Sequence, residues 1–256
     1  MSLRLHLLST DFDGTLYSER DVPPVPMELQ MEIARLQQLG MKWVINTGRD
    51  LPGIMEALGR SRLCVQPDYL ALVEREIFVR ERHSYEPLVE WNQRCARDHG
   101  DLFSSVEVEL REMHQWIEQR FEANLYADSF SPLCVIASSL AEMDVIHEFL
   151  DAFAAKTSGL SVVRNDVYLR LAHRDYNKGT VLQRIAELEG FDSPNILAAG
   201  DHHNDLPMLR RDVAGMLVAP GNAIDAVKQT VRSQGGYVAQ SRCGIGILEG
   251  IRHFLG

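Results

Sequence analysis

Two aspartates near the amino terminus, Asp11 and Asp13, have the type and spacing of a catalytic pair. They follow an apolar run over residues 3–8 that stops at Ser9-Thr10, and this run predicts a strand buried on both faces. Because side chains alternate along an extended chain, the two aspartates can point the same way. Carboxylates crowded at a buried strand end repel each other unless a metal ion, another cation or a shared proton offsets their charge. The pair therefore indicates chemistry, although an acidic turn is the alternative for these residues alone.

A second acidic cluster follows another apolar run, at residues 195–199. Asp201 and Asp205 flank His202-His203-Asn204. The adjacent histidines do not share one face of a helix or strand, so they do not favour a zinc site. Carboxylate oxygens are instead the ligands that Mg²⁺ prefers, although Asp205 by itself also fits a helix cap. We therefore expect hard oxygen ligation and Mg²⁺ as the cofactor.

A hydroxyl group and two cations complete the set of candidate functional groups. Thr47 and Arg49 lie in Asn46-Thr47-Gly48-Arg49, directly after an apolar run. Lys178 opens a segment with helical spacing, where the helix dipole already presents positive charge, so its position indicates an anionic neighbour. The alternatives are a helix cap for Thr47, a solvated charge for Arg49 and a surface ammonium group for Lys178.

These four segments, in this order, resemble the motifs of the haloacid dehalogenase-like (HAD) superfamily of phosphohydrolases. Asp-Phe-Asp-Gly-Thr-Leu is similar to the first motif, and Gly-Asp-x-x-x-Asp to the fourth. The resemblance implies that Asp11 is the nucleophile and Asp13 the general acid and base. It implies catalytic roles for Thr47 and Lys178 too. The implied substrate contacts are Thr47, Gly48, Arg49, Lys178 and Asn204, and the implied Mg²⁺ ligands are Asp11, Asp13, Asp201 and Asp205.

The elements that must position these residues alternate between strands and helices. Apolar runs at 42–46, 69–73, 195–199 and 216–219 predict buried strands, and helical spacing separates them. Right-handed crossovers of this kind build a parallel sheet with its ligands at the carboxyl ends of the strands. The expected fold class is therefore α/β, with a doubly wound, mostly parallel Rossmann-like sheet. Asp11 and Thr47 should lie at one edge of it.

A long insertion interrupts this rhythm. Residues 83–173 contain segments with helical spacing and short strands, including a hairpin turn at Asn165-Asp166, and predict an α+β domain between core segments 1–82 and 174–256. Its position resembles the C2 cap type of the HAD superfamily, in the Cof-like and sucrose-phosphatase-like branch. The alternative is a domain unrelated to catalysis. One departure is Val73-Glu74-Arg75-Glu76, which replaces the Asn-Gly-Ala turn common in Cof-like members.

Composition limits the class of partner. The net charge of -10 over 256 residues argues against nucleic acid or an anionic membrane, because both need a basic surface. The four cysteines are scattered without a Cys-x-x-Cys pair, which fits a reducing cytoplasm. No run has the length of a membrane span, and the amino terminus lacks the features of a signal peptide. We expect a cytoplasmic protein whose partner is a small phosphorylated molecule; its oligomeric state is not readable.

The function expected from this sequence is Mg²⁺-dependent hydrolysis of a small phosphorylated metabolite through an aspartyl-phosphate intermediate. The cap type favours a sugar phosphate. Two alternatives remain open, namely a phosphosugar mutase, which returns the phosphoryl group to a sugar, and a non-catalytic protein that binds phosphorylated ligands. A signalling receiver module is disfavoured, because that fold has about half this length.

Overall fold

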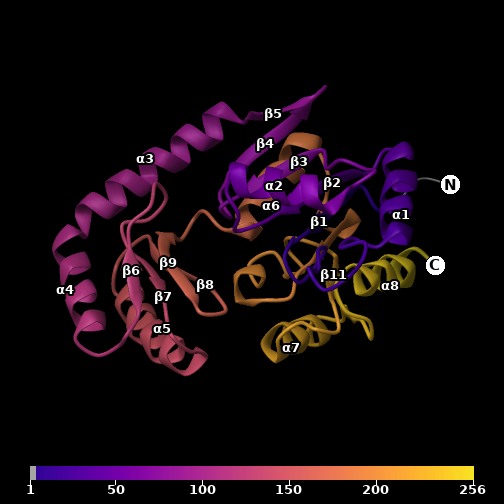
Figure 1. Cartoon of the computed structure of the whole chain (residues 1–256). Coiled ribbons are helices and arrows are strands. Elements are labelled where there is room, and N and C mark those ends of the chain that lie inside the picture. Colours follow the sequence, from indigo (N-terminus) through magenta and orange to yellow (C-terminus); the bar gives the residue numbers. More distant parts are fainter. Residues whose placement is uncertain (1–3) are drawn as a thin grey trace. The chain divides into compact units, whose positions relative to one another are not determined.

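The computed structural model describes residues 4–256, which form two compact units. One unit combines residues up to Val89 with Lys178–Gly256, and the other is Glu90–Asn177 (Figure 1). The expected domain boundaries at 83 and 173 stay a prediction. Strand β5 (Ser84–Pro87) pairs within the sheet of the first unit, which is why that unit extends beyond residue 83. Among the described residues, no helix is long and apolar enough to cross a membrane.

Over the described residues, the first unit is built on one mixed sheet. The strands on one side of β1 pair in parallel, whereas the last two on the other side run antiparallel. The order is β12 (Tyr237–Val238), β11 (Met216–Ala219), β10 (Ile196–Ala199), β1 (Leu7–Thr10), β2 (Lys42–Asn46), β3 (Tyr69–Leu72), β4 (Glu76–Glu81) and β5. The predicted α/β class and mostly parallel Rossmann-like sheet are confirmed.

Strand β1 ends later than the apolar run predicted. It includes Ser9 and Thr10, both fully buried, because β1 has a parallel neighbour on each side and Thr10 is paired with Ala199 and Ile45. The Thr10 hydroxyl accepts a hydrogen bond from the Trp43 indole at 3.2 Å, so its burial leaves no polar group unsatisfied. The extra length carries Asp11 to the carboxyl edge of the sheet.

Helices cover both faces of this sheet. Gly250 of α8 approaches the Val218 side chain of β11, whereas Val231 of α7 and the neighbouring Leu217 both border Gly236. Successive strand residues point to opposite faces, so α7 and α8 lie on different sides. The helices of this unit are α1 (Met27–Gln38), α2 (Leu51–Ser61), α6 (Lys178–Glu189), α7 (Asp225–Ser233) and α8 (Cys243–Leu255), with short 3₁₀ turns η1 (Ser193–Asn195) and η2 (His203–Asp205).

The second unit is an α+β layer with its own core. Its antiparallel sheet has the order β6 (Asn124–Tyr126), β7 (Cys134–Ile136), β9 (Tyr168–His173) and β8 (Leu160–Asn165). Its helices are α3 (Val89–Ser105), α4 (Glu107–Glu118) and α5 (Leu140–Ala154). Met113 and Ile117 of α4 and Ile146 and Leu150 of α5 belong to the same buried cluster as Leu169 of β9, so these helices pack on the sheet.

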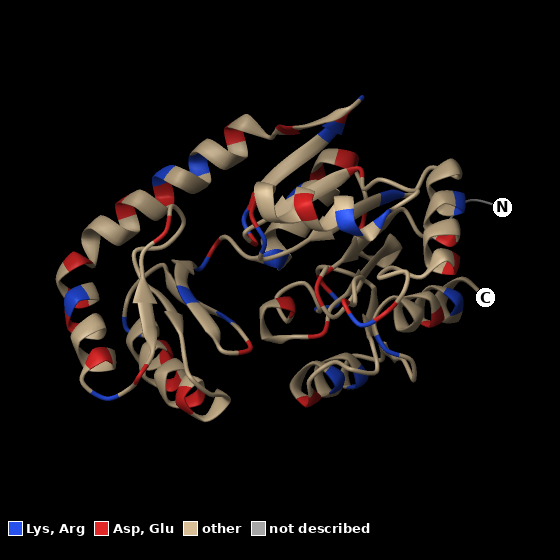
Figure 2. Ribbon diagram, in the orientation of Figure 1, with Lys and Arg blue, Asp and Glu red and all other residues tan. Residues whose placement is uncertain are grey.

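The second unit contains a capped helix, and the hairpin turn predicted from Asn165-Asp166 is confirmed. The Ser139 hydroxyl accepts from the Glu142 backbone N–H at 3.2 Å, which caps α5. Asp166 has φ of 54°, the left-handed conformation that a tight turn between β8 and β9 requires. Acidic residues occur in both units, so the net negative charge does not come from a single tail (Figure 2).

Candidate active site

The candidate residues gather where the strand order reverses, at the carboxyl edge of the sheet. Asp11 follows β1, Thr47 follows β2 and Asp201 follows β10, and β1 is the central strand of the three. A parallel α/β sheet binds its ligands at such a switch point. Gly14, with φ of 77°, turns the chain here, and a Cβ on it would lie only 2.5 Å from a carboxylate oxygen of Asp201. Glycine therefore allows the first and fourth motifs to meet.

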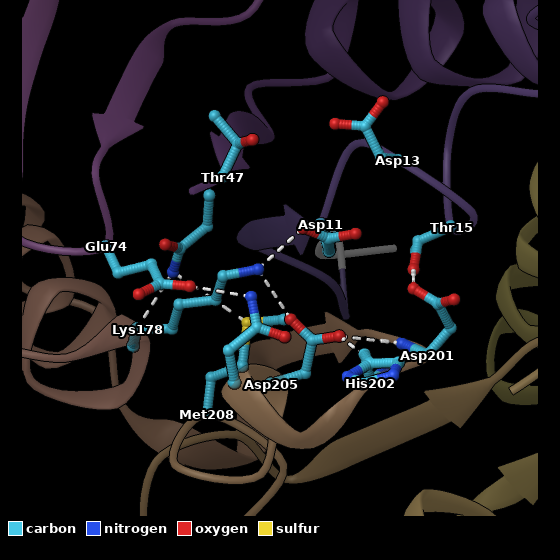
Figure 3. A network of polar contacts seen from close by, with 12 residues as sticks. Asp11, Asp13, Thr15, Thr47, Glu74, Lys178, Asp201, His202, Asp205 and Met208 are labelled. Atoms are coloured by element: carbon cyan, nitrogen blue, oxygen red, sulfur yellow. Dashed lines mark hydrogen bonds and ion pairs between the residues drawn. The ribbon is translucent and has the colours of Figure 1, made fainter. Parts of the chain in front are cut away.

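Lys178 is the centre of this arrangement. It is the first residue of α6 and has no exposed surface. Its ammonium group donates to Asp11 Oδ1 at 2.6 Å and to Asp205 Oδ1 at 2.6 Å (Figure 3). Asn46 holds the start of the helix, because its side-chain amide donates to the Lys178 carbonyl at 2.9 Å. The anionic neighbours expected for a lysine at a helix amino terminus are therefore present.

Burial and crowding shift the proton affinities of these groups. Burial raises the pKa of Asp11 well above its usual value, and the nearby Asp205 and Asp201 raise it further. Burial and Asp205 likewise raise the pKa of Asp201 to about 7. Burial opposes the charge of Lys178, but Asp11, Asp205 and Glu74 outweigh it and raise the pKa of its ammonium group. When fully ionised, the three carboxylates of Asp11, Asp201 and Asp205 would carry more negative charge than the single ammonium group of Lys178 offsets.

Three of these carboxylates are spaced to hold a cation. Asp11, Asp201 and Asp205 each offer an oxygen, and these oxygens lie within 4.8 Å of one another. The Thr15 hydroxyl donates to Asp201 Oδ1 at 2.7 Å. Asp205 differs from the others, because its Oδ1 accepts from Lys178 and its Oδ2 accepts from the backbone N–H groups of Asp201 and His202 at 2.8 and 2.9 Å. Asp205 is therefore already engaged in fixing the lysine and the loop after β10.

Asp13 lies apart from this carboxylate cluster and pairs with Arg49. The guanidinium group donates to both carboxylate oxygens of Asp13 at 2.7 Å, and it also lies 5.6 Å from the ring centroid of Phe12. Asp13 and Arg49 are partly exposed, unlike Asp11 and Lys178. Asp13 therefore stands where solvent and ligands have access.

Thr47 and Gly48 lie in the loop after β2, directly before Arg49, which pairs with Asp13. Thr47 is 1% exposed, and its hydroxyl accepts from the Arg49 backbone N–H at 3.2 Å. A Cβ on Gly48 would lie 3.4 Å from a carboxylate oxygen of Glu74. The same Glu74 oxygen accepts from the Asn204 side-chain amide at 2.6 Å. The loop after β2 and the loop after β10 thus meet at Glu74.

Sequence reasoning missed three residues of this network. Thr15 lies inside the first motif, so its hydroxyl could have been considered beside the two aspartates. Asn46 ends a buried strand, and a polar side chain at such a position needs a partner. Glu74 was noted only as a departure from a family pattern. Asn222 supports the turn at Gly14, because its side-chain amide donates to the Gly14 carbonyl at 2.7 Å.

A family model, a relative and a solved structure each match nearly the whole chain. Residues 4–255 match the family model described as sucrose-6F-phosphate phosphohydrolase. The 5-amino-6-(5-phospho-D-ribitylamino)uracil phosphatase YcsE of Bacillus subtilis is 24% identical, over 98% of this chain and 96% of the relative. The sucrose-phosphatase of Synechocystis sp. PCC6803, solved in complex with sucrose and phosphate, superposes with a TM-score of 0.74 at 20% identity, covering 98% of both chains.

A further structural neighbour is the haloacid dehalogenase-like hydrolase yhjK of Bacillus subtilis, with a TM-score of 0.63, 18% identity and coverage of 98% of this chain and 92% of that one. These solved structures agree with the fold of a Rossmann-like core with a cap. The match to the family model and the resemblance of the four motifs lead to one assignment. The chain belongs to the sucrose-6F-phosphate phosphohydrolase family of HAD-like phosphatases and is a phosphoric monoester hydrolase.

Proposed function

We propose that this phosphatase is Mg²⁺-dependent and hydrolyses a small sugar phosphate through an aspartyl-phosphate intermediate on Asp11. The observation that supports this most strongly is the buried contact of Lys178 with Asp11 and Asp205 at 2.6 Å. A phosphate monoester is dianionic, so a carboxylate can attack it only where fixed positive charge offsets the repulsion. Lys178 supplies one such charge beside the attacking oxygen.

The residues around Asp11 fit a divalent cation. The cluster offers only carboxylate oxygens, which suits a hard ion such as Mg²⁺, and burial together with Asp205 raises the pKa of Asp201, which a bound cation would oppose. Asp11 and Asp201 would hold the ion directly, and the Asp13 backbone carbonyl would contribute a further oxygen. Asp205, whose oxygens already accept hydrogen bonds, would orient the ion's water and Lys178. When bound, Mg²⁺ would neutralise charge on the phosphoryl oxygens.

The residues would divide the chemistry between them. An Asp11 oxygen attacks phosphorus, forming one O–P bond while the bond to the leaving oxygen breaks. Asp13 gives its proton to that leaving oxygen and later takes a proton from the water that hydrolyses the acyl phosphate. Arg49 engages both oxygens of Asp13, so this pair must open before Asp13 can act as an acid. Thr47, Gly48, Lys178 and Asn204 would contact the phosphoryl oxygens.

A sugar phosphate is the substrate class that the family favours. The family model carries the description of a sucrose-6F-phosphate phosphohydrolase, and the second unit would be the C2-type cap that selects the leaving group. Arg49, with a planar guanidinium group near the partly exposed Asp13, is a candidate for contacts with the organic part of the substrate.

A panel of phosphorylated metabolites tests the proposal. We expect phosphate release with Mg²⁺, and loss of release with a chelator and in Asp11→Asn. Acid quenching during turnover of labelled substrate should trap the phosphoryl group on the wild-type chain and not on Asp11→Asn. Undiminished release from Asp11→Asn would remove Asp11 from the mechanism. Turnover that requires a sugar bisphosphate activator and yields an isomeric sugar phosphate would identify a mutase instead.

A further inference from the structure

Glu74 occupies a turn for which its residue type is poorly suited. Val73 and Glu74 join β3 to β4 and have φ values of 44° and 62°, and the Arg75 N–H bonds to the Leu72 carbonyl at 2.9 Å. Two central residues with positive φ are typical of a type I′ hairpin turn, which favours asparagine and glycine. A β-branched valine and a glutamate are disfavoured there. Local preference therefore does not explain why a glutamate stands at this position.

The surroundings of Glu74 do explain it. The turn is tied to the loop of the second motif, because the Glu74 N–H donates to the Thr47 carbonyl at 3.1 Å and the Val73 N–H to the Arg49 carbonyl at 3.0 Å. Glu74 is 4% exposed, and its Oε1 accepts from Asn204 Nδ2 at 2.6 Å. Figure 3 shows its carboxylate close to Lys178 and directed into the same polar network as Asp205.

We propose that Glu74 is a positioning residue that fixes the Asn204 amide for contact with the phosphoryl group. This inference rests on the proposed function, which makes Asn204 a ligand of the phosphoryl oxygens. A carboxylate accepts and does not donate, so it holds the NH₂ end of the amide towards itself. One N–H is used by Glu74, and the second remains for an anionic ligand. Rotation of the amide would instead turn its oxygen towards the phosphate and repel it.

A second observation agrees with a fixed orientation of the Asn204 amide. Its amide oxygen is buried and accepts no hydrogen bond from the residues that the structure describes. Buried polar atoms normally have a partner, and an amide free to rotate would not keep its acceptor unsatisfied. The charge-assisted bond to Glu74, shorter than a neutral one, holds the amide in this orientation.

Two substitutions separate the hydrogen bond from the charge. Glu74→Gly removes the carboxylate and suits the positive φ, so we expect an unfolding midpoint equal to or above that of the wild type. Glu74→Gln keeps an acceptor oxygen for Asn204 and removes the charge. With p-nitrophenyl phosphate and Mg²⁺, we expect Glu74→Gly to raise KM, and the inhibition constant of inorganic phosphate, roughly 10- to 100-fold. Glu74→Gln should raise both constants less than Glu74→Gly does, because its amide oxygen can still accept from Asn204, although its NH₂ group can also bond to the Asn204 oxygen.

A double-mutant cycle tests whether Glu74 acts through Asn204. The rise in KM and in the phosphate inhibition constant caused by Asn204→Ala is the largest that Glu74 can produce through this amide. The combination of Glu74→Gly with Asn204→Ala should therefore raise both constants no more than Asn204→Ala alone. Additive losses would overturn the proposal, because Glu74 would then act independently of the amide. Unchanged KM and phosphate inhibition in Glu74→Gly would overturn it as well, and so would equal losses in Glu74→Gln and Glu74→Gly.

Controls separate this inference from the proposed function. Glu81→Gln removes an exposed carboxylate from β4, the strand that follows the turn at Glu74, and should leave KM unchanged. Asp11→Asn should abolish turnover whether Glu74 is present or substituted. Phosphate affinity can be measured calorimetrically in the Asp11→Asn background. Loss of turnover in Asp11→Asn with unaltered phosphate affinity in Glu74→Gly would leave the phosphatase mechanism standing and remove the role of Glu74.

Discussion

Replacing Lys178 by methionine tests the charge balance on which the site depends. Lys178 has no exposed surface and bonds to Asp11 and Asp205 at 2.6 Å each. Methionine has a similar length and fits an apolar pocket, but it leaves the two buried carboxylates without their cation. The expected result is loss of turnover together with a clear loss of stability, both largest in metal-free protein at pH 8, where these carboxylates are most fully ionised.

The magnitude follows from the burial of the pair. Removing one partner of a buried ion pair costs about 3–5 kcal/mol, because the remaining charge is desolvated and uncompensated. For a protein of this size, 1 kcal/mol corresponds to about 2–4 °C in the unfolding midpoint, so we expect a decrease of about 6–20 °C. Adding Mg²⁺ should raise the unfolding midpoint of Lys178→Met more than that of the wild type, because the bound ion would offset the carboxylate charge that Lys178 no longer neutralises.

Thermal unfolding followed by circular dichroism, with chelator and with Mg²⁺, measures both effects. Lys156→Met is the matched control, since Lys156 is exposed, and it should keep the wild-type midpoint. Combining Lys178→Met with Asp11→Asn removes one uncompensated charge and should recover part of the loss. A midpoint for Lys178→Met within 2 °C of the wild type, roughly the shift for a change below 1 kcal/mol, would refute the inferred buried ammonium group.

Three further predictions concern Asp201 and the residues that contact it. Thr15→Val removes the 2.7 Å hydrogen bond to Asp201 and should weaken Mg²⁺ binding roughly 10- to 100-fold by calorimetry; equal affinity would show that the hydroxyl does not orient this carboxylate. The pKa of Asp201, raised to about 7 from an unfolded value near 3.9, means that the folded protein binds the extra proton, so stability in chelator should fall as pH rises from about 4 to 7. With stability measured by urea unfolding at several pH values, the decrease in unfolding free energy with pH should be smaller for Asp201→Asn. An equal decrease in both proteins would show that Asp201 does not cause this pH dependence. Gly14→Ala places a Cβ 2.5 Å from Asp201 at a φ of 77°, so Mg²⁺-dependent turnover should fall at least about 100-fold, whereas retained turnover would mean that the turn can move aside.

Much of the core could be predicted because its signals are local. Period-two and continuous apolar runs marked the buried strands, and the helix with Lys178 at its first residue followed from spacing and from Gly190 at its end. The placement of Asp11 and Thr47 at one edge followed from topology, since parallel strands bring their carboxyl ends to one edge. An anion beside Lys178 could also be predicted, because a cation at a helix amino terminus needs one.

The remaining features depend on side-chain contacts between distant segments. Thr15 bonds to Asp201 and Asn204 to Glu74, and each pair is separated by more than a hundred residues. No periodicity encodes such pairs, because they depend on how two loops meet after the strands are in register. The left-handed turn at Glu74 also runs against local preference, so no local pattern predicts a glutamate in the site.

The amino-acid sequence by itself therefore determined the α/β class, the edge of the sheet that carries the chemistry and the acidic and basic residues available there. The tertiary structure decided how these residues share their hydrogen bonds. In the folded chain, both oxygens of Asp205 accept hydrogen bonds from protein donors, Asp13 pairs with Arg49, and Glu74 accepts from Asn204. The physical reason is that backbone pairing follows from local patterns, whereas the choice of partner for a buried polar group is made by whichever donors and acceptors the packed loops bring within reach.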